Sequence, residues 1–329
     1  MNGAELLQTK VPTPPEARRL MAEGLDEELS SLRELHLLSR LGEIACFVLL
    51  WAGGCAISLA GLSLEVPVAL RYGIAAVGVL LSAVALNAFV LLLHEGMHYT
   101  LFRNAFVNRW VSVLLGLPLL ISYTAYQVMH LRHHQFLGDP RDPDDYENYT
   151  NNPAKLWRMH YGRLALGAFL YLLFIPILAW RHGSRVDRRR LVVEYVVMAA
   201  VWLAVVCLVP PLVLLWAWGL PVILVGYMTN IRGFTQHGIT DAHDPFLASR
   251  TVLPNRVVEF CLLNENYHLE HHLFPEVPSY HLPRLHQLIT PKLPRRVSTT
   301  SYFGFLFRFF RLSPRVPTAP IGLEVREES

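Results

Sequence analysis

Long apolar stretches constrain this chain more than any other feature of its sequence. Five of them approach the roughly 20 residues that an α-helix needs to cross a bilayer: Ile44–Leu64, Tyr72–Leu93, Leu164–Trp180, Leu191–Val209 and Leu212–Ile231. Only 17% of the residues are charged, against about 25% in soluble globular domains. The sequence therefore predicts an all-α integral membrane protein.

Basic residues beside these stretches indicate the face of the membrane that each end occupies. Lysine and arginine collect on the cytoplasmic side, and five of them precede the first stretch: Lys10, Arg18, Arg19, Arg33 and Arg40. We therefore expect the N-terminus to be cytoplasmic.

The stretch Leu164–Trp180 is the shortest of the five and has basic clusters on both flanks. It is therefore expected to dip into the membrane and return rather than to cross. The other four stretches then form two hairpins, the second closing at Pro210-Pro211, with both termini and the histidine clusters on the cytoplasmic face. Five crossings are the alternative, which would place the C-terminal motifs on the opposite face.

The chain divides into a membrane domain and two flanking segments. Residues 1–43 are expected to form a cytoplasmic segment with an interfacial helix at Asp26–Leu41, and they lack the apolar core of a signal peptide. Residues 44–312 form the membrane domain, which ends on a second interfacial helix, Tyr302–Leu312. Inside it, the apolar segment Val111–Ser122 is broken by a glycine and a proline and is too short to cross. Residues 313–329 are expected to be disordered.

Histidines carry the chemistry that the sequence reveals. Eight of the 15 histidines fall into three clusters: His94 with His98, His130 with His133 and His134, and His268 with His271 and His272. On a helix, residues i and i+4 are about 40° apart, so each cluster presents its imidazoles from one side. Eight imidazoles exceed the three or four ligands of a single zinc ion, which favours two metal ions. The four cysteines form no CxxC pair, which argues against a thiolate site.

The order HxxxH, HxxHH and a distal HxxHH resembles the three histidine boxes of the membrane fatty acid desaturases. Neighbouring residues strengthen the resemblance, which runs from about residue 44 to 290 and includes Gly138–Asp144 and Asn266–Pro275. It implies a non-haem centre of two Fe²⁺ ions and O2 as co-substrate. It also implies a lipid or acyl-chain substrate and a separate electron donor, either a ferredoxin or a cytochrome b5-type reductase chain.

The same resemblance implies a ninth ligand, His237, between the last apolar stretch and the third box. Desaturases of this kind often have glutamate before that histidine, whereas this chain has Gln236. The expected metal ligands are therefore His94, His98, His130, His133, His134, His237, His268, His271 and His272.

Carboxylates near the boxes are candidates to orient the ligands, because metal-bound imidazoles usually donate their second N–H to an acceptor. We single out Glu95, Glu270 and Asp241 as the main candidates, with Asp139, Asp142 and Asp144 beside them. The six other histidines are expected at the surface or the membrane interface: His36, His160, His182, His243, His281 and His286.

Three other functions remain open at this level. Related di-iron hydroxylases and carotenoid ketolases share the boxes, and a non-catalytic iron-binding protein would retain them. An intramembrane zinc protease is also compatible with His94-Glu95-Gly96-Met97-His98, in which Glu95 would be the general base. The net charge of +3 gives no reason to expect nucleic acid as a partner. Desaturation of an acyl chain is the function that the sequence favours.

Overall fold

The computed structural model describes residues 11–312, except 144, 146–149 and 151. Within these residues the chain is helical and has no strand beyond two isolated bridges. It divides into two compact units: residues 1–34, 130–165 and 230–329 form unit 1, and residues 35–129 and 166–229 form unit 2. The expected disordered tail, 313–329, lies outside the described residues.

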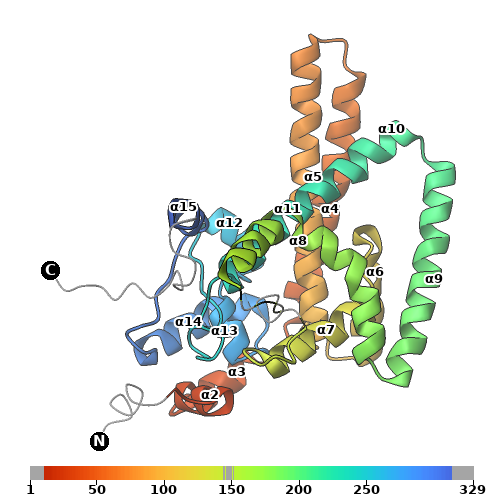
Figure 1. Ribbon diagram of the computed structural model, residues 1–329. Coiled ribbons are helices and arrows are strands. Elements are labelled where there is room, and N and C mark those ends of the chain that lie inside the picture. Colours follow the sequence, from red (N-terminus) through yellow and green to blue (C-terminus); the bar gives the residue numbers. More distant parts are fainter. Residues whose placement is uncertain (1–10, 144, 146–149, 151, 313–329) are drawn as a thin grey trace, which may run out of the picture. The chain divides into compact units, whose positions relative to one another are not determined.

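Unit 2 is built on an antiparallel hairpin of α4 (Leu37–Ser63) and α5 (Val68–Met97) (Figure 1). Small residues let the two backbones touch. A Cβ added to Gly54 would lie 2.8 Å from the Gly78 carbonyl oxygen, and one added to Gly78 would lie 2.3 Å from the Ser58 nitrogen. Close packing of small residues is a main source of helix association in a bilayer, where the lipid removes most of the hydrophobic driving force.

A sharp bend follows the hairpin. Helix α6 (Ala105–Gly116) runs into the short turn η1 (Leu117–Leu119), and α7 (Tyr123–Phe136) leaves at an angle of 102°. The expected break in Val111–Ser122 is therefore confirmed.

A buried carboxylate holds this bend. Glu194 of α9 (Arg185–Leu208) accepts hydrogen bonds from the hydroxyls of Ser122 and Thr124 and from the Thr124 backbone N–H, and it pairs with Arg109. It thereby satisfies an N-terminal donor of α7 and is itself neutralised, as a charge in an apolar setting requires.

Five helical stretches within the described residues are long and apolar enough to cross a membrane, one more than the four expected. Besides α4, α5 and α9, they are α8 (Pro153–His182) and the run of α10 (Pro211–Leu214), η3 (Leu215–Gly219) and α11 (Leu220–His237).

The expected chain reversal inside Leu164–Trp180 is wrong. The segment belongs to α8, which is one continuous helix of 30 residues. The internal Pro176 removes a single backbone donor, and the rest of the helical hydrogen-bond ladder continues past it. The break at Pro210-Pro211 is confirmed, since α9 ends at Leu208 and α10 begins at Pro211. The number of crossings and their orientation stay predictions.

The N-terminal helices α2 (Pro14–Ala22) and α3 (Asp26–Leu32) belong to the core of unit 1. Their apolar side chains pack against α13 (His268–Leu273) and α14 (Leu282–Ile289). The expected interfacial helix Asp26–Leu41 is therefore wrong. Helix α3 ends at Leu32, and a separate helix begins at Leu37, because the apolar residues at 29 and 32 are buried in a protein core instead of facing lipid.

The C-terminal helix α15 (Tyr302–Leu312) is confirmed with its expected bounds. Phe305 and Phe309 on one face are buried in unit 1 against Trp157 and Phe234, whereas Phe303 on the other face is exposed. The remaining short elements of unit 1 are α12 (Arg256–Cys261), η4 (Ser279–His281) and η5 (Thr290–Lys292).

The hairpin contact makes a paired prediction. Gly54→Ala should lower the free energy of unfolding by about 1–3 kcal/mol, because its methyl group would overlap the Gly78 carbonyl. Gly53→Ala is the control, since a Cβ at Gly53 has no heavy atom within 4 Å. Thermal unfolding of both purified variants in detergent measures the difference. Equal melting temperatures would contradict backbone contact between α4 and α5.

Candidate metal centre

Three segments of unit 1 bring seven histidines together. The part of α7 in unit 1 carries His130, His133 and His134, α11 ends on His237, and α13 carries His268, His271 and His272. Helical spacing places His130 and His134 side by side, with ring centroids 4.6 Å apart. Among the described residues of unit 1, all seven histidines expected as ligands therefore lie in one cluster.

Two groups of three histidines within this cluster have the spacing of metal ligands. In the first group, one ring nitrogen each of His130, His134 and His271 lies within 4.8 Å of the others. In the second group, His133, His237 and His272 meet the same limit. His268 adjoins the second group, with its Nε2 2.7 Å from Nε2 of His237.

The distances between ring nitrogens fit a shared cation. Neighbouring ligands with metal–nitrogen bonds of about 2.0–2.1 Å lie roughly 2.8–3.4 Å apart. Nε2 of His134 is 3.2 Å from Nε2 of His271, and Nε2 of His272 is 3.3 Å from that of His237. Imidazole donors of this kind suit iron, copper, zinc and nickel. The residues present therefore fit a pair of first-row metal ions.

The protonation state also suits metal binding. Loss of hydration lowers the pKa of His272 well below its usual value, and the neighbouring His134 and His268 lower it further. Neutral imidazole is the form that coordinates a metal. For His237, Nδ1 lies 3.2 Å from the Ala248 carbonyl oxygen. This contact requires the proton on Nδ1 and leaves the Nε2 lone pair directed at His268.

A buried carboxylate orients one ring of the second group. Asp142 is 2% exposed, and its Oδ2 lies 2.8 Å from Nδ1 of His133. The loop that returns Asp142 to the histidine turns at Gly138, which has φ of +78° and would place a Cβ 2.0 Å from the Ala242 carbonyl. A carboxylate behind a ligating imidazole fixes its tautomer and raises its basicity. Asp142 thus has the contact expected of it.

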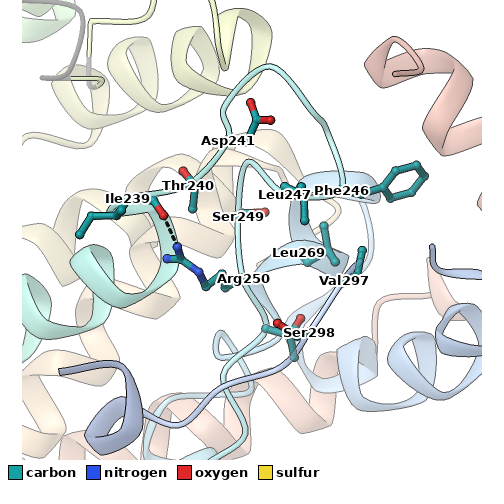
Figure 2. A pocket seen from close by; sticks show the side chains of 11 residues that line it. Ile239, Thr240, Asp241, Phe246, Leu247, Ser249, Arg250, Leu269, Val297 and Ser298 are labelled. Carbon is teal, nitrogen blue, oxygen red and sulfur yellow. Dashed lines mark hydrogen bonds between the residues drawn. The ribbon is translucent and has the colours of Figure 1, made fainter. Parts of the chain in front are cut away.

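Two of the three main carboxylate candidates, Glu270 and Asp241, have partners other than the expected metal ligands. Glu270 is buried in α13, where it accepts a hydrogen bond from the Thr251 hydroxyl and lies 2.6 Å from Nδ1 of His286. Asp241 accepts a hydrogen bond from the His243 backbone and lines a pocket of unit 1 (Figure 2).

Of the two other neighbouring aspartates, only Asp139 has a described partner. Asp139 pairs with Arg141, whose hydrogen bonds lower the pKa of Asp139 to about 2. Asp144 lies outside the described residues.

The first box belongs to unit 2. His94 and His98 close α5, with ring centroids 5.3 Å apart. Between them Glu95 forms a buried ion pair with Arg40, which also contacts Glu43 and the Thr100 carbonyl. A carboxylate neutralised by a buried guanidinium is a poor general base. This pairing argues against the zinc-protease interpretation.

Several site residues could not be found from sequence patterns. Glu265 is fully buried, with its carboxylate 3.8 Å from Nδ1 of His268, and its only signal was an acid three residues before the third box. In the sequence Arg40 is one of the basic residues that indicate membrane orientation, and no sequence pattern identifies it as the partner of Glu95.

The expectation of a surface position is wrong for one of the six other histidines, His160, whereas His286 is half-buried. His286 contacts buried Glu270, and His160 is 3% exposed beside Trp157 and Phe234. His36 and His243 are exposed as expected, and His182 and His281 are half-buried.

Asp142 makes a testable prediction. Asp142→Ala should weaken metal binding by about 10–100-fold, the usual effect of removing a carboxylate behind a ligand. Asp139→Ala removes an equal charge from the same loop and should leave affinity unchanged, because Asp139 pairs with Arg141 instead. Competitive titration of the purified proteins with Fe²⁺ and a chelator gives both affinities. Equal losses in the two variants would refute the orienting role.

Comparison with known proteins agrees with this geometry. The sequence model of the family described as "Fatty acid desaturase" matches residues 72–304. A mouse sphingolipid delta(4)-desaturase/C4-monooxygenase is 27% identical over 217 residues, which cover 61% of each chain. Its rat counterpart is 29% identical over 221 residues, or 63% of this chain and 62% of the relative.

A bacterial relative is similar to the same extent. Dihydrorhizobitoxine desaturase of Bradyrhizobium elkanii is 25% identical over 244 residues, which cover 65% of this chain and 67% of the relative. The chain thus spans about three fifths of the length of the mouse and rat relatives.

Proposed function

We propose that this chain, which belongs to the fatty acid desaturase family, is a membrane enzyme that introduces a double bond into the hydrocarbon chain of a lipid. It would do so with two iron ions, O2 and electrons from a separate donor. One observation carries the proposal, namely the two groups of three histidines whose ring nitrogens have ligand spacing. One such group would serve a single-metal enzyme, and two serve a pair.

The proposed ligand set contains nine histidines. Seven are the clustered residues of unit 1: His130, His133, His134, His237, His268, His271 and His272. His94 and His98 are added because they form the first histidine box by sequence and end a helix with both rings on one side. Nine ligands divided between two ions would fill most of the coordination positions and leave few for water. O2 and the substrate would then have access to the metals at defined sites.

Iron, when bound, would supply the activation of O2 that removal of hydrogen from an unactivated methylene requires. The protein's own contribution is to hold the imidazoles neutral and fixed. Asp142 keeps the proton of His133 on Nδ1, and the Ala248 carbonyl does the same for His237. Arg40 neutralises Glu95, so that the first box carries no free acid that competes for the metal.

The relatives favour a long-chain lipid as substrate. The mouse and rat proteins are named as sphingolipid desaturases, and a chain rich in membrane-length helices meets such a lipid within the bilayer. Hydroxylation is the second candidate, because the same names include C4-monooxygenase activity. Both outcomes begin with removal of one hydrogen, and they differ in whether a second hydrogen leaves or oxygen is added.

Lipid profiling of cells that express the wild type or His271→Ala tests the proposal. The wild type should yield lipids that lack two hydrogens, and the variant should not. Products that gain one oxygen would assign hydroxylation instead. Identical profiles, combined with purified protein that holds about one zinc ion and no iron, would overturn the proposal in favour of a single-metal protein. Iron must be loaded before assay, because imidazole sites also bind zinc well.

The ninth ligand gives a sharper prediction. His237→Ala should lower the iron content and abolish turnover, since its Nε2 faces His268 and His272. His243→Ala, six residues on, changes an exposed histidine and should retain both irons and most of its activity. Two irons and normal turnover in His237→Ala would remove His237 from the ligand set and leave the three boxes intact.

The proposed topology places the metal centre and both termini on the cytoplasmic face, with four crossings. Its support is the basic residues near both ends of α8 and the proline pair at the start of α10. Reporter fusions after Arg185 and at Ser329 should both give a cytoplasmic signal. Non-cytoplasmic signals from both fusions would mean that α8 crosses the membrane, because the hairpin of α9 and the α10–α11 run returns the chain to the face from which it started; the four-crossing topology would then be wrong.

A further inference from the structure

A short segment of unit 1, residues 248–252, lies in the stretch of chain between α11, which ends on His237, and the third histidine box. We call this segment the strap. It carries Arg250, which is buried although it is an arginine. Figure 2 shows the guanidinium of Arg250 reaching to the Ile239 carbonyl, at the end of α11. A buried guanidinium needs several hydrogen-bond acceptors. The acceptors that Arg250 contacts indicate which part of the structure it holds.

Arg250 caps the C-terminus of α11. A helix leaves its last four carbonyls without intrahelical partners. The backbone N–H of Arg250 donates to the Gln236 carbonyl at 3.0 Å, and its guanidinium donates to the carbonyls of Thr235, Gly238 and Ile239. A positive charge is also favourable at the negative end of the helix dipole.

The other two end carbonyls have local partners. The Phe234 carbonyl accepts from the Gly238 N–H, and the His237 carbonyl accepts from the Thr240 hydroxyl at 2.9 Å. Ile239 has φ of +55°, a left-handed turn that a β-branched residue adopts only under constraint. Arg250 supplies that constraint by holding the carbonyls on both sides of the turn. The guanidinium also lies over the Phe305 ring, 5.1 Å from its centroid.

The strap also sets the ring of His237. Ala248, two residues before Arg250, offers its carbonyl to Nδ1 of His237 at 3.2 Å. The same few residues thus fix the helix end that carries His237 and the direction in which its imidazole points.

The other end of the strap is tied to the third box. The Val252 N–H donates to the Asn266 carbonyl at 2.8 Å, and the Asn266 side chain donates back to the Val252 carbonyl at 3.0 Å. The Thr251 hydroxyl donates to Glu270, which lies between two proposed ligands. One strap therefore connects His237 with the helix that carries His272.

We propose that Arg250 is a positioning residue for one metal of the pair, the one served by His133, His237 and His272. This inference rests on the proposed function, because it concerns a metal that only the proposed centre would hold. The guanidinium holds the end of α11, which carries His237 of the second group, whereas the three histidines of the first group lie on α7 and α13. Its loss should therefore empty one metal position and spare the other.

Metal stoichiometry tests this assignment without recourse to activity. Purified Arg250→Met in detergent, titrated anaerobically with Fe²⁺, should retain one tightly bound iron per chain and bind the second at least about tenfold more weakly than the wild type. A general loss of stability would affect both positions alike. Arg250→Lys keeps the charge but lacks the planar fork, and it should restore part of the second affinity.

Arg296→Met is the matched control. Arg296 also lies over an aromatic ring, that of Phe246, and it pairs with the carboxylate of Asp244, seven residues beyond the end of α11. It should bind two irons with the affinities of the wild type.

Two irons at wild-type affinity in folded Arg250→Met would overturn the inference. If that variant does not fold, two irons at wild-type affinity in Arg250→Lys would overturn it as well. A wild type that binds no iron pair would refute the proposed function instead.

Discussion

The close approach of imidazole nitrogens is the interaction on which the arrangement of unit 1 depends. Neutral imidazoles that direct lone pairs at one another at 2.7–3.3 Å repel, whereas a cation between them turns the same spacing into coordination. The surrounding structure acts to hold this spacing. Asp142 and the Ala248 carbonyl fix two rings from behind, and the strap anchors the helix end between them. The N-terminal helices add to the core beneath α13.

Three buried charges among the described residues have partners that neutralise or bind them. Glu95 has Arg40, Glu194 has Arg109, and Arg250 has backbone carbonyls. Removing one partner of such a pair leaves an uncompensated charge and costs several kcal/mol, roughly 3–5. The pair at Glu95 also has a functional consequence. It takes away the general base that a zinc protease with this HExxH sequence would need.

Membership of the desaturase family and the seven clustered histidines support each other, because they rest on different evidence. The family match concerns the order of residues along the chain, while the cluster concerns distances between ring nitrogens. What the family does not decide is the fate of the substrate. Two of the relatives are named as both desaturase and monooxygenase, so similarity to them leaves both reactions open.

The sequence by itself determined the helical membrane class, the break before α7, the proline boundary before α10, the helix Tyr302–Leu312 and the contents of the histidine clusters. Each of these is a local property, set by hydrophobic length, by proline or by a spacing of three or four residues. Only the tertiary structure decided that Leu29 and Leu32 face a core, that His286 contacts Glu270, and that Arg250 caps the helix of His237. These contacts join residues that are far apart along the chain or on separate elements. A buried arginine and an interfacial one are identical in sequence, and only the partners brought to them by folding distinguish the two.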